Sequence, residues 1–432
     1  MDKVKSHLEN VAVFGQGFVG LPLSLSFSFR GCNVYGVDIL EKLVNETNKG
    51  ITHHTECFEG KTIQTILNEE LEAGRYRATA DIPGALEKCN NIVLTVGMTE
   101  VIECCKTIGK YLKKGDLVLV RSTVVPGTTE DKVLPILEEE SGMKAGVDFY
   151  LAYSSERIAE GFAFDEFAYM PTITAGVNAE SAARAKELLE VVCQVPVIVA
   201  SEIKIVETSK VFENVQRDVN IAMVQEFARF TEALGVSIHE VIEVANTHKR
   251  VNLLTPGPGV GGYCIPNAYH YIEPKATEMN MTMDILKLCR EKNADLPNVM
   301  VNILKDSLKS VSKELSGAKV GVLGFAMKDY SNDDRISPPI EIIKLLIEAG
   351  AKVEAFDPAV PTDYDFKVDS LDKVLNGKDA IVVLAKQKQF DEITADSIIS
   401  SVNKNAVVFD TRNLFKGIKD ELNSSNIVYT TI

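Results

Sequence analysis

The stretch VAVFGQGFVGLPLSLSFSFRG, residues 11–31, decides the fold class of this chain. It begins with a short apolar run over 11–14, which predicts a buried strand, and continues through a glycine-rich turn into a helix-like segment. The segment NVYGVDI, residues 33–39, has the pattern of a second strand. A strand, a crossover helix and another strand form a βαβ unit, which builds parallel sheets.

The same stretch contains a phosphate-binding pattern. Gly15, Gly17 and Gly20 form G-x-G-x-x-G between the predicted strand and helix, with Phe18 and Val19 inside the motif. In this context the glycines allow a tight turn, a close approach of pyrophosphate to the backbone, and close helix–strand packing. Asp38 ends the second strand, where a carboxylate accepts hydrogen bonds from ribose hydroxyls and disfavours a 2′-phosphate. The pattern predicts a site for NAD. Lys42 is a weaker candidate for the same pocket, or a solvated side chain.

Working outward, apolar runs at 91–96, 117–123 and 195–200 alternate with helix-like stretches, which predicts a doubly wound parallel sheet. Residues 203–234 contain no proline or glycine and predict one helix of about 45 Å. A second α/β pattern begins at Ala318. We therefore predict an α/β protein with two Rossmann-like doubly wound domains, over 1–202 and 315–432. A long central helix and a helical middle domain, over 203–314, join them.

The bulk composition excludes several classes of protein. The 432 residues carry a net charge of −15, which argues against general nucleic-acid binding. No apolar run approaches the length of a membrane span, and the polar N-terminus shows no signal-peptide pattern. The eight cysteines form no CxxC pair and suit a reducing compartment. We expect a cytoplasmic protein with no nucleic-acid, membrane or metal partner.

A second pattern, GPGVGGYCIP at 257–266, places Cys264 after a glycine-rich loop. The residues alone leave Cys264 either as a nucleophile or as a small side chain in a turn. Lys210 and Asn214 lie four apart on the predicted long helix, so they share a face, either as donors to an oxyanion or as a solvated surface. Glu156 and Glu160 are also four apart, either as a base and its support or as salt-bridging residues.

Together these segments resemble the UDP-glucose/GDP-mannose dehydrogenase family along nearly the whole chain. The matching segments are GQGFVGLPLS at 15–24, GRYRATAD at 74–81, RSTVVPGTT at 121–129, YSSERIAEG at 153–161, SKVFENVQRDVNIAMVQE at 209–226, NTHKRVN at 246–252, GPGVGGYCIP at 257–266, MKDYSNDDRISP at 327–338, FDP at 356–358 and DTRN at 410–413. The resemblance implies an NAD-dependent, four-electron oxidation of the C6 hydroxyl of a nucleotide sugar to a carboxylate. It also implies a homodimer formed through the long helix.

By the same resemblance, Cys264 forms the thiohemiacetal and thioester, and Lys210 and Asn214 stabilise the oxyanion. Glu156 and Glu160 lie near the sugar, and Thr123 orients a water. The implied NAD-binding residues are Gly15, Gly17, Phe18, Val19, Gly20, Asp38, Lys42, Thr95, Ser122 and Arg335. The implied substrate-binding residues are Arg250, Gly257, Gly261, Gly262, Tyr263, Lys328 and Arg412. The cysteine loop is similar to those of enzymes for UDP-N-acetylhexosamines, whereas Tyr263 is similar to the UDP-glucose branch, so the sugar stays open.

The chain departs from this family at positions that bear on the chemistry. Ala268 stands four residues after Cys264, where the resemblance predicts an aspartate. The loop after the strand at 91–96 is shortened, and Ser154-Ser155 replaces a Ser-Pro pair. Two alternatives therefore stay open. The first is a remodelled member with two-electron chemistry or a different substrate, and the second is a non-catalytic protein that binds nucleotide sugars.

Overall fold

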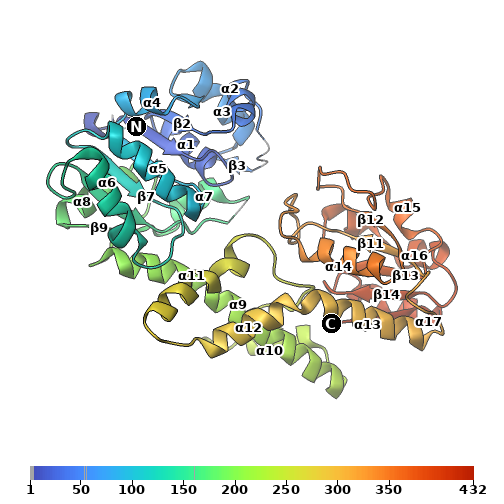
Figure 1. The fold of residues 1–432 in the computed structure, drawn as a ribbon. Helices are drawn as coiled ribbons and strands as arrows, with labels where there is room; N and C mark the ends of the chain where they lie inside the picture. The colour runs from blue at the N-terminus through green and yellow to red at the C-terminus, as the bar shows by residue number, and fades with distance from the viewer. Residues whose placement is uncertain (1–3, 53, 55, 160) are drawn as a thin grey trace. The chain divides into compact units, whose positions relative to one another are not determined.

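The structure is a computed structural model that describes residues 4–52, 54, 56–159 and 161–432. The chain divides into two compact units, Met1–Phe212 and Glu213–Ile432. The predicted long helix is present as α9 (Ile203–Leu234), and the boundary between the units falls within it. Each unit is built around its own sheet (Figure 1).

The N-terminal unit contains an eight-stranded sheet in the order β10-β9-β8-β7-β6-β1-β2-β5. Its strands are β1 (Asn10–Phe14), β2 (Asn33–Val37), β5 (Tyr76–Thr79), β6 (Asn91–Leu94), β7 (Leu117–Val120), β8 (Tyr150–Ser154), β9 (Ile173–Gly176) and β10 (Ile198–Val199). The strands β5-β2-β1-β6-β7-β8, in their order across the sheet, all run parallel to one another. This is the strand order of a Rossmann fold. This confirms the predicted doubly wound architecture.

The far edge of this sheet differs from the prediction. Strand β9 pairs antiparallel with β8, and the strand predicted over 195–200 shrinks to the two residues of β10. Both residues of β10 are exposed and pair only with β9. The apolar residues at 195–200 predicted a longer strand, but an edge strand has a neighbour on one side only, and only two of these residues pair. An antiparallel strand near the edge is common on doubly wound sheets.

Helices cover both faces of the N-terminal sheet. They are α1 (Gly20–Phe29), α2 (Glu41–Asn48), α3 (Ile63–Glu72), α4 (Ile82–Lys88), α5 (Met98–Tyr111), α6 (Leu134–Ser141), α7 (Ala163–Tyr169) and α8 (Ala179–Leu189), with a small hairpin of β3 (Cys57–Phe58) and β4 (Lys61–Thr62). Alternate residues of the strands enter two hydrophobic clusters: Val11 and Val13 pack with α1, whereas Ala12 and Phe14 pack in the cluster that contains Val101 of α5. Burial on both faces explains the continuous apolar runs that predicted these strands.

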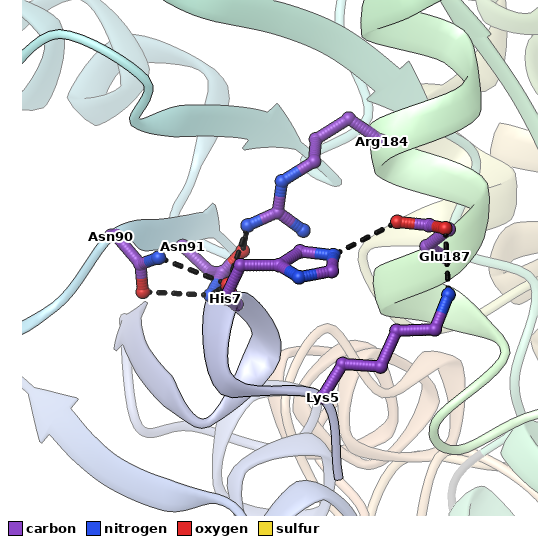
Figure 2. Close-up of polar contacts among 6 residues, drawn as sticks. All are labelled: Lys5, His7, Asn90, Asn91, Arg184 and Glu187. Atoms are coloured by element: carbon purple, nitrogen blue, oxygen red, sulfur yellow. Dashed lines mark hydrogen bonds and ion pairs between the residues drawn. The ribbon is translucent and has the colours of Figure 1, made fainter.

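The N-terminal segment before β1 is tied to α8 and to the start of β6 (Figure 2). Glu187 on α8 accepts hydrogen bonds from Lys5 and His7, at 2.8 and 3.0 Å. Arg184, one turn earlier, donates to the His7 carbonyl and to Asn91 Oδ1 at 2.6 and 2.7 Å. These contacts fix the start of β1, the strand that leads into the glycine-rich turn.

The second unit contains a five-stranded parallel sheet in the order β12-β11-β13-β14-β15. Its strands are β11 (Lys319–Leu323), β12 (Lys352–Phe356), β13 (Ala380–Val383), β14 (Val407–Asp410) and β15 (Val428–Thr431). Its helices are α10 (Ile238–Ala245), α11 (Cys264–Glu278), α12 (Asp284–Ala294), α13 (Leu296–Ser310), α14 (Pro338–Glu348), α15 (Leu371–Leu375), α16 (Ala395–Ser401) and α17 (Lys419–Ser424). The strand order is 2-1-3-4-5, the other common doubly wound order.

One hydrophobic cluster joins the helical segment of this unit to its sheet. Ala228 of α9, Ile238 of α10 and Met300 of α13 belong to the same buried cluster as Val320 and Val322 of β11. The loop that carries Cys264 is therefore attached to a scaffold that includes the C-terminal sheet.

Candidate active site

The glycine-rich turn lies between β1 and α1, as predicted. Gly15 has φ 86°, and a Cβ there would lie 2.9 Å from the Thr95 carbonyl oxygen. A Cβ at Gly20 would overlap the Gly15 carbonyl oxygen, so only glycine lets α1 pack so closely. A Cβ at Gly17 would meet nothing within 4 Å. The open side of the turn is at Gly17, which fits the approach of a dinucleotide pyrophosphate to the backbone.

The start of α1 is the second part of the predicted pyrophosphate site. Phe18 and Val19 precede the helix, and no side chain caps its N-terminus. Uncapped N–H groups and the positive end of the helix dipole favour an anion.

Asp38 is held at the end of β2 by two backbone groups. Its Oδ2 accepts from Gln16 N at 2.8 Å and its Oδ1 accepts from Leu40 N at 2.9 Å. The carboxylate is thereby aimed toward the turn, and each oxygen retains a lone pair for a ribose hydroxyl. Lys42 lies on the surface of α2, 3.8 Å from Glu46, where a solvated role suits it better than a pocket.

Two hydroxyls expected near NAD hold the backbone of this region. Thr95 Oγ1 donates to the Phe14 and Gly15 carbonyls at 2.8 and 3.0 Å, and Ser122 Oγ donates to the Val96 carbonyl at 2.6 Å. Helix α5 begins at Met98, so the connection after β6 is as short as the sequence predicted.

Gln16, which the sequence analysis passed over, organises the turn from beneath. Its side-chain amide nitrogen donates to the Val13 and Gly15 carbonyls, and its Oε1 accepts from Ser24 and Tyr76 at 3.2 and 2.9 Å. A Cβ at Gly36 would collide with the Gln16 carboxamide and approach the Tyr76 hydroxyl. The buried amide is thus fully hydrogen-bonded, and Gly36 provides the space for it. The signal available in the sequence was a polar residue inside an otherwise apolar motif.

We expect Gln16→Leu to lower the free energy of unfolding by about 1–3 kcal/mol, because the buried Tyr76 hydroxyl loses its acceptor. The mutation should also weaken NAD binding, since the turn loses its tether. Urea unfolding and NAD titration measure the two effects. Tyr76→Phe is the matched control: it removes one donor while Ser24 still serves Gln16, and should cost about 1 kcal/mol. A Gln16→Leu protein as stable as the wild type would contradict this account.

The carboxylate of Glu156 is anchored by a buried ion pair. Its Oε2 lies 2.7 Å from Arg121 Nη2, and its Oε1 accepts from the N–H groups of Arg157 and Ile158. The Arg121 guanidinium also lies over the Phe167 ring, 5.3 Å from its centroid. Arg121 was missed in the sequence because it directly follows an apolar strand. Glu160, the partner expected for Glu156, lies outside the described residues.

The segment after β7 that carries Thr123 is tied to α9. Glu207, which is 0 % exposed, accepts from Gly127 N at 2.5 Å and from Thr129 N at 3.0 Å. Burial raises the pKa of Glu207, although the hydrogen bonds from Thr129 and Gly127 oppose that shift. Glu207 precedes Lys210 by three residues, so one helix both fixes the loop of Thr123 and carries the predicted oxyanion donor.

Lys210 and Asn214 share one face of α9, as predicted. Their exposed fractions are 7 % and 3 %, and neither side chain makes a hydrogen bond with another residue in the described part of the chain. Their polar atoms are not among the fully buried side-chain atoms that lack a hydrogen bond in the described residues, so a bound ligand can reach them. This favours the oxyanion interpretation over a solvated helix face.

The glycine loop before Cys264 packs closely on neighbouring parts of its own unit. Gln225 of α9 donates to the Gly257 carbonyl at 2.6 Å, and Gly262 N donates to the Ile336 carbonyl at 3.1 Å. A Cβ at Gly257 would collide with Arg412, and one at Gly261 would lie 2.8 Å from Pro338 Cδ. The glycines expected to approach the sugar therefore also allow the loop to lie against the C-terminal α/β segment.

Cys264 is exposed and is the first residue of α11. The N-terminal turn of a helix stabilises negative charge, which suits a sulfur nucleophile. Ala268, one turn along, is 1 % exposed and offers no polar group. The exposure of Cys264 is not expected of a small side chain that packs inside a turn, and it is what a nucleophile requires.

Cationic residues of the second unit lie near the point where the strand order of its sheet reverses. The order switches between β11 and β13, and ligands of such sheets bind outside the carboxyl ends of the strands at that point. Arg412 follows β14 and contacts Asp329 at 2.6 Å, and Asp329 also accepts from Lys386 N at 2.8 Å. Lys328, adjacent to Asp329, is exposed. The arrangement suits an anionic nucleotide, and Asp329, which no local sequence pattern singles out, holds Arg412 in place.

Three predicted residues remain: Arg335 and Tyr263, which contact each other, and Arg250. Arg335 forms two hydrogen bonds with Asp333, at 2.8 and 2.6 Å, and its guanidinium lies 5.5 Å from the centre of the Tyr263 ring. The structure thus brings together a residue expected at the cofactor and one expected at the substrate. Arg250 is exposed in the segment after α10.

In residues 4–52, 54, 56–159 and 161–432, no group of three or more His, Cys, Asp or Glu side chains is placed to hold a metal ion. No helix within those ranges has the length and apolar character needed to span a membrane.

Comparison with known proteins identifies the class. The models of the UDP-glucose/GDP-mannose dehydrogenase family match as its NAD binding domain at residues 9–195, its central domain at 204–295 and its UDP binding domain at 321–417. The UDP-N-acetyl-D-mannosamine dehydrogenase of Pyrococcus horikoshii is 32 % identical over 94 % of this chain and 96 % of its own. The UDP-N-acetyl-D-glucosamine 6-dehydrogenase of Salmonella typhi is 30 % identical over 95 % and 96 %.

A solved structure of the UDP-D-ManNAc dehydrogenase from Pyrococcus horikoshii superposes with a TM-score of 0.89, covering 98 % of this chain and 99 % of the other at 31 % identity. The fold and the dinucleotide site thus define an NAD-dependent oxidoreductase acting on nucleotide sugars. The chain belongs to the UDP-glucose/GDP-mannose dehydrogenase family.

Proposed function

We propose that this protein oxidises the C6 hydroxyl of a UDP-N-acetylhexosamine or UDP-hexose to a carboxylate through a thioester on Cys264. The observation that carries the proposal is the exposure of Cys264 at the start of α11, after a loop braced against Arg412 and Pro338. The names of the relatives favour an N-acetylated sugar. Gly15, Gly17, Gly20 and Asp38 would hold NAD, which when bound would supply the hydride acceptor for both oxidations.

The residues divide the work in this proposal. Addition of the Cys264 thiol to the C6 aldehyde gives a thiohemiacetal, and loss of hydride gives a thioester that water cleaves. Lys210 and Asn214 donate hydrogen bonds to the oxyanion that forms when sulfur or water adds to the carbonyl. Thr123 orients the water. Glu156 and Glu160, four residues apart in sequence, lie near the sugar. Lys328 and Arg412 bind the diphosphate, and Arg250, Tyr263 and the loop at 257–262 hold the sugar nucleotide.

The proposal is tested by incubating the purified protein with NAD and a panel of UDP- and GDP-sugars, followed by mass spectrometry of the products. Two NADH per sugar and a carboxylate product support it. Two departures from the family, Ala268 and the short connection between β6 and α5, favour a second candidate: oxidation that stops at the aldehyde. One NADH and an aldehyde would establish that candidate, and binding of both ligands without any NADH would overturn both.

We further propose that the protein is a homodimer formed through α9. Met223, Phe227, Phe230 and Leu234 are exposed at the spacing i, i+4, i+7 and i+11, so they form one apolar stripe. Val241 and Val244 of α10 are exposed as well. Contiguous apolar surface of this kind marks an interaction site, and a helix stripe can pair with a second copy of itself.

We expect Phe230→Asp to convert the dimer into monomers, because it places a charge on a side chain that is 66 % exposed at the centre of the stripe. Light scattering during size-exclusion chromatography measures the mass. Asn302→Asp, which adds the same charge at an exposed position on α13, is the control and should stay dimeric. A wild-type protein that is monomeric at micromolar concentration would refute the dimer.

A further inference from the structure

The helix that begins with Cys264 carries a phenol on the same face as the thiol. Residues spaced i, i+4 and i+7 share one face of an α-helix, which groups Cys264, Ala268 and Tyr271 on α11. Helical side chains lean toward the helix N-terminus, over the preceding turn. This direction points the Tyr271 side chain toward the end of α11 that holds Cys264.

The electrostatics of Tyr271 agree with this geometry. Burial raises the pKa of the Tyr271 phenol, and the negative charge of a Cys264 thiolate raises it further. The phenol therefore stays protonated at neutral pH, as a proton donor must. In the described part of the chain, the Tyr271 hydroxyl makes no hydrogen bond, whereas the nearby Tyr269 hydroxyl donates to Glu273 at 3.1 Å.

The first turn of α11 offers no other acid or base. Ile265, Pro266 and Ala268 have none, and the Asn267 amide donates to the Tyr263 carbonyl at 2.8 Å. Hydrolysis of a thioester requires a group that takes a proton from water and one that protonates the departing sulfur. Along this face of the helix, Tyr271 is the titratable side chain nearest to Cys264.

We propose that Tyr271 is a catalytic residue for hydrolysis of the Cys264 thioester and relays the proton of the attacking water to the sulfur. This rests on the function proposed above. The water oxygen bonds to the thioester carbonyl carbon, and the carbon–sulfur bond breaks. The water proton passes to the phenol oxygen as the phenol proton passes to sulfur. The products are the sugar acid, a free Cys264 thiol and an unchanged Tyr271, with no electron transfer.

The test uses Tyr271→Phe in the full-length protein, with NAD and the UDP-sugar that the wild type oxidises. We expect a burst of two NADH per active site, then a steady rate lower by roughly 10²-fold, because both oxidations precede the slowed hydrolysis. Intact-protein mass spectrometry should show the sugar acyl group on Cys264, and hydroxylamine should release it. Ala268→Asp added to Tyr271→Phe should restore much of the steady rate by placing a carboxylate one turn from the sulfur.

The control is Tyr269→Phe, which removes a hydroxyl from the same helix and should turn over without an adduct. Thermal unfolding of each variant separates a loss of fold from a loss of hydrolysis, and the acyl adduct, which only folded protein can form, keeps the test valid if Tyr271→Phe is partly destabilised. A Tyr271→Phe protein with the wild-type rate and no adduct would overturn the inference, as would a slow variant with no burst. Failure of the wild type to produce NADH with any UDP-sugar would instead overturn the proposed function.

Discussion

Gly17→Ala is expected to abolish tight NAD binding while leaving the N-terminal sheet folded. The added methyl group meets no atom of the protein within 4 Å, and Gly17 does not have a positive φ, so the free energy of unfolding should change by less than about 0.5 kcal/mol. The same methyl group occupies the open side of the turn, where the pyrophosphate must approach. We expect the dissociation constant for NAD to rise by about 10²-fold or more, roughly 2.7 kcal/mol.

Gly20→Ala is the matched comparison, because it should lower the stability of the fold, whereas Gly17→Ala should lower the affinity for NAD. The methyl group would overlap the Gly15 carbonyl oxygen and lie 2.6 Å from Thr95 Oγ1, so α1 must move away from the turn. We expect a loss of stability of about 1–3 kcal/mol. Calorimetry without ligand and titration with NAD measure the two effects. If Gly17→Ala unfolds like Gly20→Ala, or binds NAD normally, the assignment of the two glycines is wrong.

Cys264→Ser is expected to lower acid formation by about 10³-fold or more, because the nucleophile of the second oxidation is lost. NAD affinity should not change, since Cys264 is not among the residues expected to bind NAD and the glycine-rich turn and Asp38 belong to the other unit. The measurement is the rate of carboxylate production by mass spectrometry, with NADH counted in parallel. At most one NADH per sugar should form.

Cys57→Ser is the control, because Cys57 is also an exposed free cysteine but lies in the β3–β4 hairpin. It should retain full activity. Unchanged acid production by Cys264→Ser would eliminate the covalent route and leave direct hydration of the aldehyde.

Much of the fold was predictable because its signals are local. The apolar runs of β1, β6 and β7 are buried on both faces, so their composition alone indicates parallel strands. The absence of proline and glycine over 203–234 predicted α9 with the limits that the structure shows. The length of the edge strand β10 was overestimated, because an apolar sequence does not reveal that a strand pairs on one side only.

The candidate site was predictable at positions where the backbone geometry accepts only one type of residue. Gly15, with its positive φ, and Gly20, with no space for a side chain, are such cases. Arg121 and Glu207 were not, because their partners Glu156, Gly127 and Thr129 lie 35 to 80 positions away in sequence. No local pattern distinguishes such a buried charge from a solvated one.

By itself the sequence determined the class of this protein: a dinucleotide turn, a long helix with Lys210 and Asn214 on one face, and a glycine loop leading to Cys264. These features depend on helical periodicity, strand burial and the conformational range of glycine, which act over a few residues. Only the tertiary structure decided what the buried charges do, that the glycine loop packs on Arg412 and Pro338, and that Cys264 is exposed. The physical reason is that burial and electrostatic pairing depend on chain segments that the sequence separates and the fold brings together.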